Sequence, residues 1–274
     1  MQSMKRVVVQ ADGDNGFGAR LAYSLALADK FGATLTAVFA KRFYHTPVVM
    51  DAMAVADIID AQRQASNALA EKLQAAFREA MPEAAGHEFL SIDGSWEQAI
   101  THLSYSADLV VLGQNDSSDL TTTAPYTLVG DALMECGRPI LVVPYIGAAP
   151  GLPKRILVAW KDGQEASRAV MDAMPFMTDA KVKIVTVAAT DETVDNAGPA
   201  VAAWLGQHGI EAEFDEIRTD QLSPGDAILA RLGDMDIDML VMGGYSHSRL
   251  RETVLGGATS DLLQHMTVPV LMSH

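Results

Sequence analysis

An internal repeat constrains the fold of this chain more than any other feature of its sequence. Three segments of the first half resemble three segments of the second half, in the same order. The matching pairs are KRVVVQA (5–11) with KRILVAW (154–160), ADLVVLG (107–113) with IDMLVMG (237–243), and RPILVVP (138–144) with VPVLM (268–272). Residues 147–153, GAAPGLP, have the composition of a linker. We therefore expect two related domains, residues 1–148 and 152–274.

Each half alternates short apolar runs with segments of helical periodicity. In the second half the predicted strands are residues 155–160, 182–188, 212–217 (the weakest), 239–242 and 268–272, and the predicted helices are residues 163–177, 198–208, 224–233 and 260–265. The first half follows the same order, with a longer second helix at about residues 50–81. Apolar strands without alternation are typical of a parallel sheet covered by helices on both faces. The sequence thus predicts an α/β fold of two tandem doubly wound domains, each with a five-stranded parallel sheet that binds ligands at the carboxyl ends of its strands.

The charge and the apolar runs exclude several kinds of partner. Acidic residues outnumber basic ones by 35 to 20, which gives a net charge of −15, whereas nucleic acids and anionic membranes attract basic surfaces. No apolar run approaches the roughly 18 residues of a membrane span, and the first residues lack the apolar core of a signal peptide. Cys136 is the single cysteine, so no disulfide forms within the chain. We expect a cytoplasmic protein that binds neither nucleic acid nor membrane.

The loop after the fourth predicted strand of the second half is the most unusual segment. It leaves the strand through Gly243 and Gly244 and returns through Gly256 and Gly257 into a predicted helix. Glycine allows the backbone to approach a ligand closely, and the N–H groups at a helix N-terminus favour anions. Thr259 or Ser260 could cap that helix and also bind a phosphate, and the same pattern fits an ordinary turn followed by a capped helix.

The order of elements, together with this loop, resembles the universal stress protein (UspA-like) family in its tandem form, whose fold is adenine nucleotide alpha hydrolase-like. The nucleotide loop of that family reads G-x-x-G, then nine residues, then Gly and a Ser or Thr. Here Gly243 and Gly256 match the first and third glycines, Ser246 stands at the second, and Gly257 replaces the hydroxyl residue. The resemblance covers nearly the whole chain and implies that the second half binds an adenine nucleotide, ATP, aided by Mg²⁺.

The resemblance also implies where that nucleotide binds. The adenine would rest on apolar strand ends, and the phosphates would bind the N–H groups of the loop. The implied binding residues are Ala159, Trp160, Lys161, Val187, Met242, Gly243, Gly244, Ser246, His247, Gly256, Gly257, Ala258 and Thr259.

Several of these side chains have a second interpretation. Lys161 stands where the family has an Asp that contacts the nucleoside, and it either holds a phosphate or is a surface lysine. Trp160 either stacks on a base or packs against its neighbours. His247, with Arg249 and Arg251, forms either a cationic entrance for phosphates or a set of solvated loop charges.

The first half departs from the family pattern in a different way. Asp12 matches the Asp that contacts the nucleoside, but the loop at residues 113–127 lacks the later glycines. Asp116 takes the place of Ser246, and Asp116 and Asp119 repel phosphate. We therefore expect the first half not to bind ATP in the manner of the family.

Three functions remain open at this point. The resemblance implies a stress-response sensor or regulator that binds ATP, with no catalytic residues and no metal ligands of its own. The alternative is a nucleotide-independent scaffold with degenerate sites that binds an unknown protein partner. A slow ATPase is the third, although the sequence offers no evident general base.

Assembly is the last expectation from the resemblance. Domains of the family pair through their last strands, so residues 140–143 and 270–272 should meet about a pseudo-two-fold axis within the chain. A further homodimer is compatible with this arrangement. Residues 43–60, an extra segment of the first half, form a partner surface, a lid or part of a longer packed helix.

Overall fold

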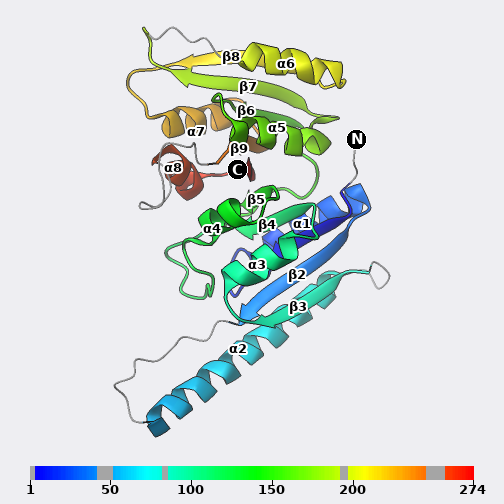
Figure 1. Cartoon of the computed structure of the whole chain (residues 1–274), viewed down its shortest axis with the longest axis vertical. Helices are drawn as coiled ribbons and strands as arrows, with labels where there is room; N and C mark the ends of the chain where they lie inside the picture. The colour runs from blue at the N-terminus through cyan, green and yellow to red at the C-terminus, as the bar shows by residue number, and fades with distance from the viewer. Residues whose placement is uncertain (1–3, 42–51, 82–85, 192–196, 245–256) are drawn as a thin grey trace.

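The computed structural model describes residues 4–41, 52–81, 86–191, 197–244 and 257–274, and for residues 52–54 and 257–258 it describes the backbone alone. Strands and helices alternate along both halves of the chain (Figure 1). The strands are β1 (Arg6–Gln10), β2 (Thr34–Lys41), β3 (Glu88–Asp93), β4 (Leu109–Gly113), β5 (Ile140–Val143), β6 (Arg155–Ala159), β7 (Lys181–Ala188), β8 (Ala212–Arg218), β9 (Met239–Gly243) and β10 (Val270–Ser273). The helices are α1 (Phe17–Phe31), α2 (Ala52–Ala80), α3 (Trp96–Ser104), α4 (Leu128–Glu135), α5 (Gln164–Met177), α6 (Gly198–Gln207), α7 (Pro224–Asp234) and α8 (Gly257–His265).

The ten described strands form one sheet in the order β3-β2-β1-β4-β5-β10-β9-β6-β7-β8. All strand pairs within a half are parallel, and the winding reverses between β1 and β4 and again between β6 and β9. The two five-stranded halves join through β5 and β10, which pair antiparallel with Leu141 opposite Leu271. The predicted fold class and the predicted pairing of the last strands are therefore confirmed.

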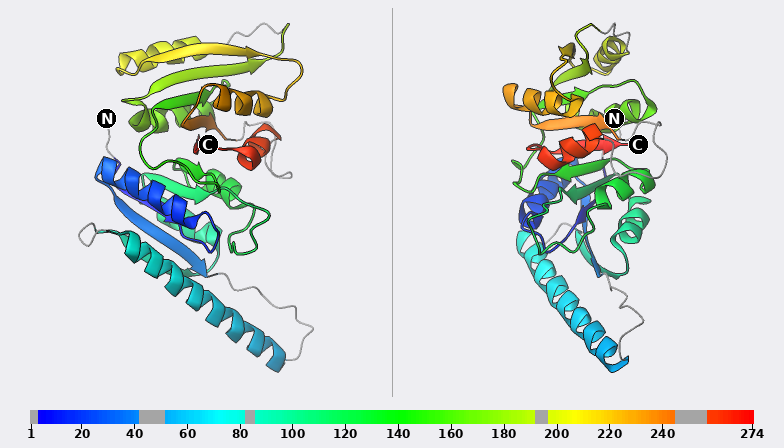
Figure 2. Two further views of the ribbon diagram at one scale, coloured as in Figure 1. Left: turned by 180° about the vertical axis from the view of Figure 1, so that it is seen from behind. Right: turned by 90° about the vertical axis from the view of Figure 1, so that its left-hand side faces the viewer.

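The core follows the inner strands of the sheet, from β2 to β7, rather than its two edges. Val7, Val8 and Val9 of β1 have no exposed surface, because helices cover both faces of the sheet (Figure 2). The outer strands β3 and β8 have one neighbouring strand each and are only partly buried. This edge position explains why the apolar pattern of residues 212–217 is the weakest of the second half.

Helix α2 is the longest element, with 29 residues, and it agrees with the long helix predicted from the sequence. Its C-terminal part packs on the sheet through Leu73 and Phe77, which are buried, and the Phe77 ring lies 5.9 Å from that of Phe89 in β3. Its N-terminal part extends beyond the sheet (Figure 1). Residues 52–60 of the extra segment belong to this helix, whereas residues 43–51 lie outside the described part of the chain.

The two halves also meet through side chains. The rings of Phe31 in α1 and Phe176 in α5 make an edge-to-face contact at 5.6 Å. None of the helices in the described ranges combines the length and the apolar character that a membrane crossing requires.

Candidate functional site

The carboxyl ends of three adjacent strands form the base of the candidate site in the second half. Ala159 at the end of β6 pairs with Met242 of β9 on one side and with Val185 of β7 on the other, and Val187 lies further along β7. Met242 is buried, and Ala159 and Val187 are partly exposed. The structure thus brings together the three apolar residues that the sequence assigned to the adenine.

Gly243 at the end of β9 has a packing role. A Cβ atom on this residue would lie 2.6 Å from the backbone nitrogen of Ala166 and 2.8 Å from the carbonyl carbon of Glu165. Only glycine therefore allows the first turn of α5 to approach the strand this closely. Glu165 in that turn is buried, which places a carboxylate near the N-terminus of α5, where the helix dipole favours it. The sequence analysis missed Glu165, although an acidic residue at a helix start is a recognisable signal.

Gly244 also has a packing role, between the halves. A Cβ atom here would lie 2.1 Å from Cδ2 of Leu133 in α4 of the first half. Its N–H group donates to the carbonyl of Ser273 at 2.9 Å, which extends the pairing of β9 with β10 by one residue. Packing thus explains both of these loop glycines without a ligand.

Trp160 packs into the protein. The side chain is 6% exposed, and its Nε1 donates to Oδ1 of Asp162 at 2.7 Å. The same oxygen accepts from the backbone N–H of Ala197 at 3.1 Å, and the hydroxyl of Thr186 donates to the Trp160 carbonyl. Of the two interpretations of Trp160, the geometry favours packing.

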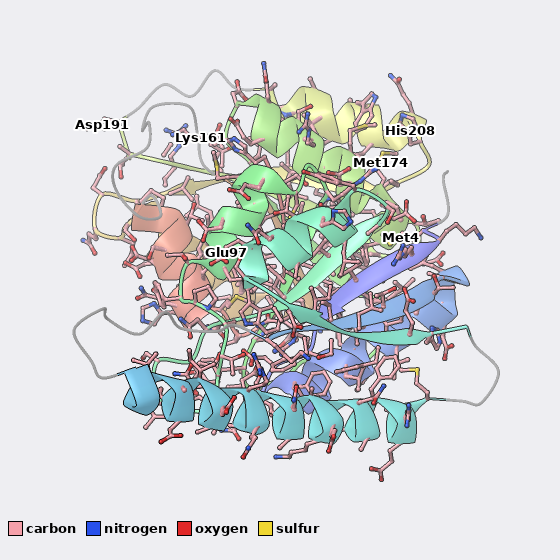
Figure 3. All side chains as sticks on the ribbon, turned by 60° about the horizontal axis from the view of Figure 1, so that its bottom comes forward. Met4, Glu97, Lys161, Met174, Asp191 and His208 are labelled. Atoms are coloured by element: carbon pink, nitrogen blue, oxygen red, sulfur yellow. The ribbon has the colours of Figure 1, made fainter. Side chains whose placement is uncertain are left out.

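Lys161 follows Trp160 on the surface (Figure 3). Its side chain is exposed and forms no ion pair with a carboxylate of the described residues. A cation without a partner, beside apolar strand ends, is suited to hold an anionic group of a ligand.

Three of the remaining predicted residues belong to the first turn of α8. Ser246, His247 and Gly256 fall outside the described residues. Gly257 and Ala258 are the first two residues of α8, and Thr259 is buried in its first turn. The predicted capping by Thr259 or Ser260 is wrong, because the helix begins at Gly257 and both residues lie inside it.

In the first half, the loop at residues 113–127 folds over Asp12, the acidic residue that would contact a nucleoside. Asp12 has no exposed surface, and its carboxylate accepts hydrogen bonds from the hydroxyls of Thr122 and Thr123 at 2.8 and 2.7 Å. It also accepts from the backbone N–H groups of Gly13, Thr123 and Ala124. The loop is therefore closed over Asp12, and that the first half does not bind ATP stays a prediction. The signal in the sequence is the run of three threonines, residues 121–123.

A second network holds the same loop. Asp119 accepts hydrogen bonds from the hydroxyl and N–H of Thr121 and from the N–H of Asn15, and these bonds hold the pKa of its carboxyl below the ordinary value. Gln114 donates through Nε2 to the carbonyls of Leu263 and Gln264, at the C-terminal end of α8. The first-half loop is thus attached both to its own domain and to helix α8 of the second half.

Within the described ranges, no group of three or more His, Cys, Asp or Glu residues is placed to hold a metal ion.

Comparison with known proteins relates the second half of the chain to a family. Residues 153–274 match the model of the Universal stress protein family. A universal stress protein of Synechocystis sp. is 29% identical over 123 residues, and the match covers 43% of this chain and 41% of that protein, so the chain spans about two fifths of the relative's length.

Solved structures extend the likeness to the whole chain. A universal stress protein from Archaeoglobus fulgidus DSM 4304 aligns over 98% of this chain and 96% of its own, with 18% identity and a TM-score of 0.67. A functionally unknown protein from Pseudomonas aeruginosa PAO1 aligns over 98% and 92%, with 16% identity and a TM-score of 0.61. The resemblance to the universal stress protein family is therefore confirmed, since residues 153–274 form a domain of that family and the whole chain has the fold of a solved universal stress protein.

Proposed function

We propose that this protein is a stress-response regulator that binds an adenine nucleotide, ATP, in its second half. The observation that carries the proposal is the pairing of Ala159 with Met242 at the carboxyl ends of β6 and β9, with Val187 two residues beyond the partner of Ala159 in β7. These partly apolar strand ends offer a surface for an adenine ring. In doubly wound sheets, ligands bind at this edge, where the winding reverses.

The charges beside this surface fit the phosphates. Lys161 is exposed and unpaired among the described residues, so its ammonium group is available. Helix α8 begins at Gly257, and its N-terminal N–H groups favour an anion. Asp162 is engaged by Trp160 and Ala197, so Mg²⁺ would be held by the phosphates and water rather than by this carboxylate.

The proposal assigns different roles to the two domains, residues 1–148 and 152–274. Asp12 is enclosed by its own loop in the first half, whereas the corresponding residue of the second half, Lys161, is exposed. The nucleotide would therefore bind one site per chain, and the protein would act by reporting occupancy rather than by catalysis.

Calorimetry with ATP, ADP and AMP in the presence of Mg²⁺ tests the proposal. Lys161→Ala should weaken ATP binding by about 3- to 10-fold, which corresponds to about 0.7–1.4 kcal/mol for a partly solvated charge pair. Lys154→Ala is a matched control, because it removes the same charge from an exposed lysine at the opposite end of β6. Equal effects of the two variants would place the nucleotide elsewhere.

A scaffold that binds no nucleotide is the second candidate function. It is favoured by the packing roles of Gly243 and Gly244, because neither glycine then points to a ligand. Absence of ATP, ADP and AMP binding at millimolar ligand would overturn the nucleotide proposal and favour the scaffold. A rate of ATP hydrolysis no higher than that of a protein-free control would remove the slow ATPase.

A further inference from the structure

Helix α8 connects the proposed nucleotide site to the other half of the chain. It has nine residues, Gly257–His265, and is about 14 Å long at the usual rise per residue. Isolated helices shorter than about 12–15 residues are barely stable in water, and α8 begins with glycine, a poor helix former. The order of α8, and with it the position of the N–H groups that we assign to the phosphates, therefore depends on contacts with its surroundings.

The C-terminal end of α8 is bound by a side chain of the first half. Gln114 is 7% exposed, and its Nε2 donates to the carbonyls of Leu263 and Gln264 at 2.9 and 3.0 Å. The last carbonyls of a helix have no partner within that helix, so these two bonds cap α8 from the other half. The Oε1 of Gln114 accepts from the N–H of Tyr145 at 3.1 Å, which fixes the orientation of the whole side-chain amide.

A second residue of the same loop also contacts the end of α8. The Nε2 of Gln264 donates to the hydroxyl of Tyr126 at 2.8 Å. Tyr126 and Gln114 both belong to the loop at residues 113–127, which is held over Asp12 by its threonines. The closed conformation of the first-half loop and the position of α8 are therefore linked by hydrogen bonds.

The corresponding position of the second half makes a different contact. Gln114 follows β4 as Gly244 follows β9, and their N–H groups make equivalent bonds, to the carbonyls of Val143 and Ser273. At Gly244 there is no room for a side chain, because Leu133 of α4 packs against it. At this pair of equivalent positions, the polar contact thus exists in one direction, from the first half to α8.

We propose that the first half regulates the nucleotide site of the second half, with Gln114 as the positioning residue that keeps α8 in its binding orientation. This inference rests on the proposed function, because the site that is regulated is the ATP site. When the first-half loop opens, α8 loses its cap, and the affinity for ATP falls with the fraction of molecules in which α8 is ordered. Linkage requires the reverse effect as well, so bound ATP holds the first-half loop closed.

Gln114→Leu removes both donors with little change of volume. In the full chain without nucleotide, we expect the amides of residues 261–265, which donate within α8, to exchange with solvent about tenfold faster. Calorimetry should show ATP binding about 3- to 10-fold more weakly than to the wild type. Gln207→Leu makes the same change at an exposed glutamine at the end of α6 and should alter neither measurement.

The reverse effect distinguishes positioning from a general loss of stability. Saturating ATP with Mg²⁺ should slow the exchange of the Thr123 and Ala124 amides by about 3-fold or more in the wild type, although both lie in the other half. In Gln114→Leu the same amides should exchange equally fast with and without ATP. A merely structural role of Gln114 would leave this response to ATP unchanged.

Two results would overturn the inference, and they differ from the result that overturns the nucleotide proposal. ATP binding of equal strength to Gln114→Leu and Gln207→Leu would remove the regulation and leave the nucleotide proposal in place. Equal exchange of α8 in these two variants would remove the positioning role, whether or not ATP binds. Absence of ATP binding to the wild type would overturn the nucleotide proposal and the regulation of its site together.

A milder variant keeps the test decisive if Gln114→Leu fails to fold. Tyr126→Phe removes only the hydroxyl that accepts from Gln264, and it should speed the exchange of α8 and weaken ATP binding by about 2- to 3-fold each. Tyr105→Phe is the matched control, because it removes a hydroxyl from an exposed tyrosine at the end of α3. Equal values for these two variants would overturn the inference.

Discussion

Replacing Asp12 by alanine removes the acceptor that holds the first-half loop in place. Its carboxylate has no exposed surface and accepts from two hydroxyls and three backbone N–H groups. The threonines that donate lie 110 and 111 positions further along the chain, so the contact closes a large part of the domain. Loss of this one side chain should therefore destabilise the first half and release its loop.

The magnitude follows from the donors that would remain. The N–H groups of Gly13, Thr123 and Ala124 donate to Asp12 at 2.7–3.1 Å. Each buried N–H group without an acceptor costs about 1–3 kcal/mol, whereas the two hydroxyls can turn toward other acceptors. Water will enter part of the vacated space, so we expect the lower end of the range, about 3 kcal/mol. Since a domain is stabilised by about 5–15 kcal/mol, this is a large effect.

Urea unfolding and native-state hydrogen exchange measure the two parts of this prediction. The free energy of unfolding should fall by about 3 kcal/mol in Asp12→Ala and by about half of that in Asp12→Asn, which keeps one acceptor. The amides of Thr123 and Ala124 should lose protection in both variants. A cycle with Thr123→Val should give a coupling energy of about 1 kcal/mol. A loss below 1 kcal/mol with unchanged protection of these amides would refute the reasoning.

Two further predictions concern packing and pH. Gly243→Ala should cost about 2–3 kcal/mol, since its Cβ would lie 2.6 Å from a backbone nitrogen of α5, whereas Gly233→Ala, with free space in α7, should stabilise by up to about 1 kcal/mol. Urea titrations that give both variants the same sign would contradict this. His87 accepts the N–H of Leu35 through Nδ1, and burial lowers its pKa below the ordinary 6.5. The unfolded chain therefore takes up the proton first, so stability should fall as the pH drops below about 6.5, and the wild type and His87→Gln should differ in this slope in titrations from pH 4 to 8.

The sequence predicted most of the fold because the repeat and the apolar strands depend on local patterns. Two halves with the same order of elements, each with buried strands, leave few alternatives to a doubly wound sheet. Among the strands of the second half, the prediction of β8 was the weakest. It is an edge strand with one exposed side, so fewer of its residues are apolar. The start of α8 was placed too late, because Gly257 is a poor helix former and gave no local signal for a helix.

The roles of the site residues depended on contacts between distant segments, which local patterns do not contain. Gly243 and Gly244 resemble a ligand loop in sequence, but their neighbours are Ala166 in α5 and Leu133 in the other half. The enclosure of Asp12 likewise depends on the loop 113–127 folding back over β1. These contacts become visible only when the sheet has brought the segments together.

The two halves depart from the family pattern differently, and in each half the residue at the end of the first strand suits the surroundings that it has. An aspartate at the end of β1 needs donors when it is buried, and the threonines of the first-half loop supply them in place of a ligand. A lysine at the end of β6 needs no such enclosure, because an ammonium group on a long side chain remains solvated. Placing an aspartate at position 161 without the threonine loop would therefore leave a buried carboxylate without donors. Placing a lysine at position 12 would leave the donors of the first-half loop without an acceptor. The enclosed Asp12 and the exposed Lys161 are thus two stable arrangements at the same point of a repeated sheet.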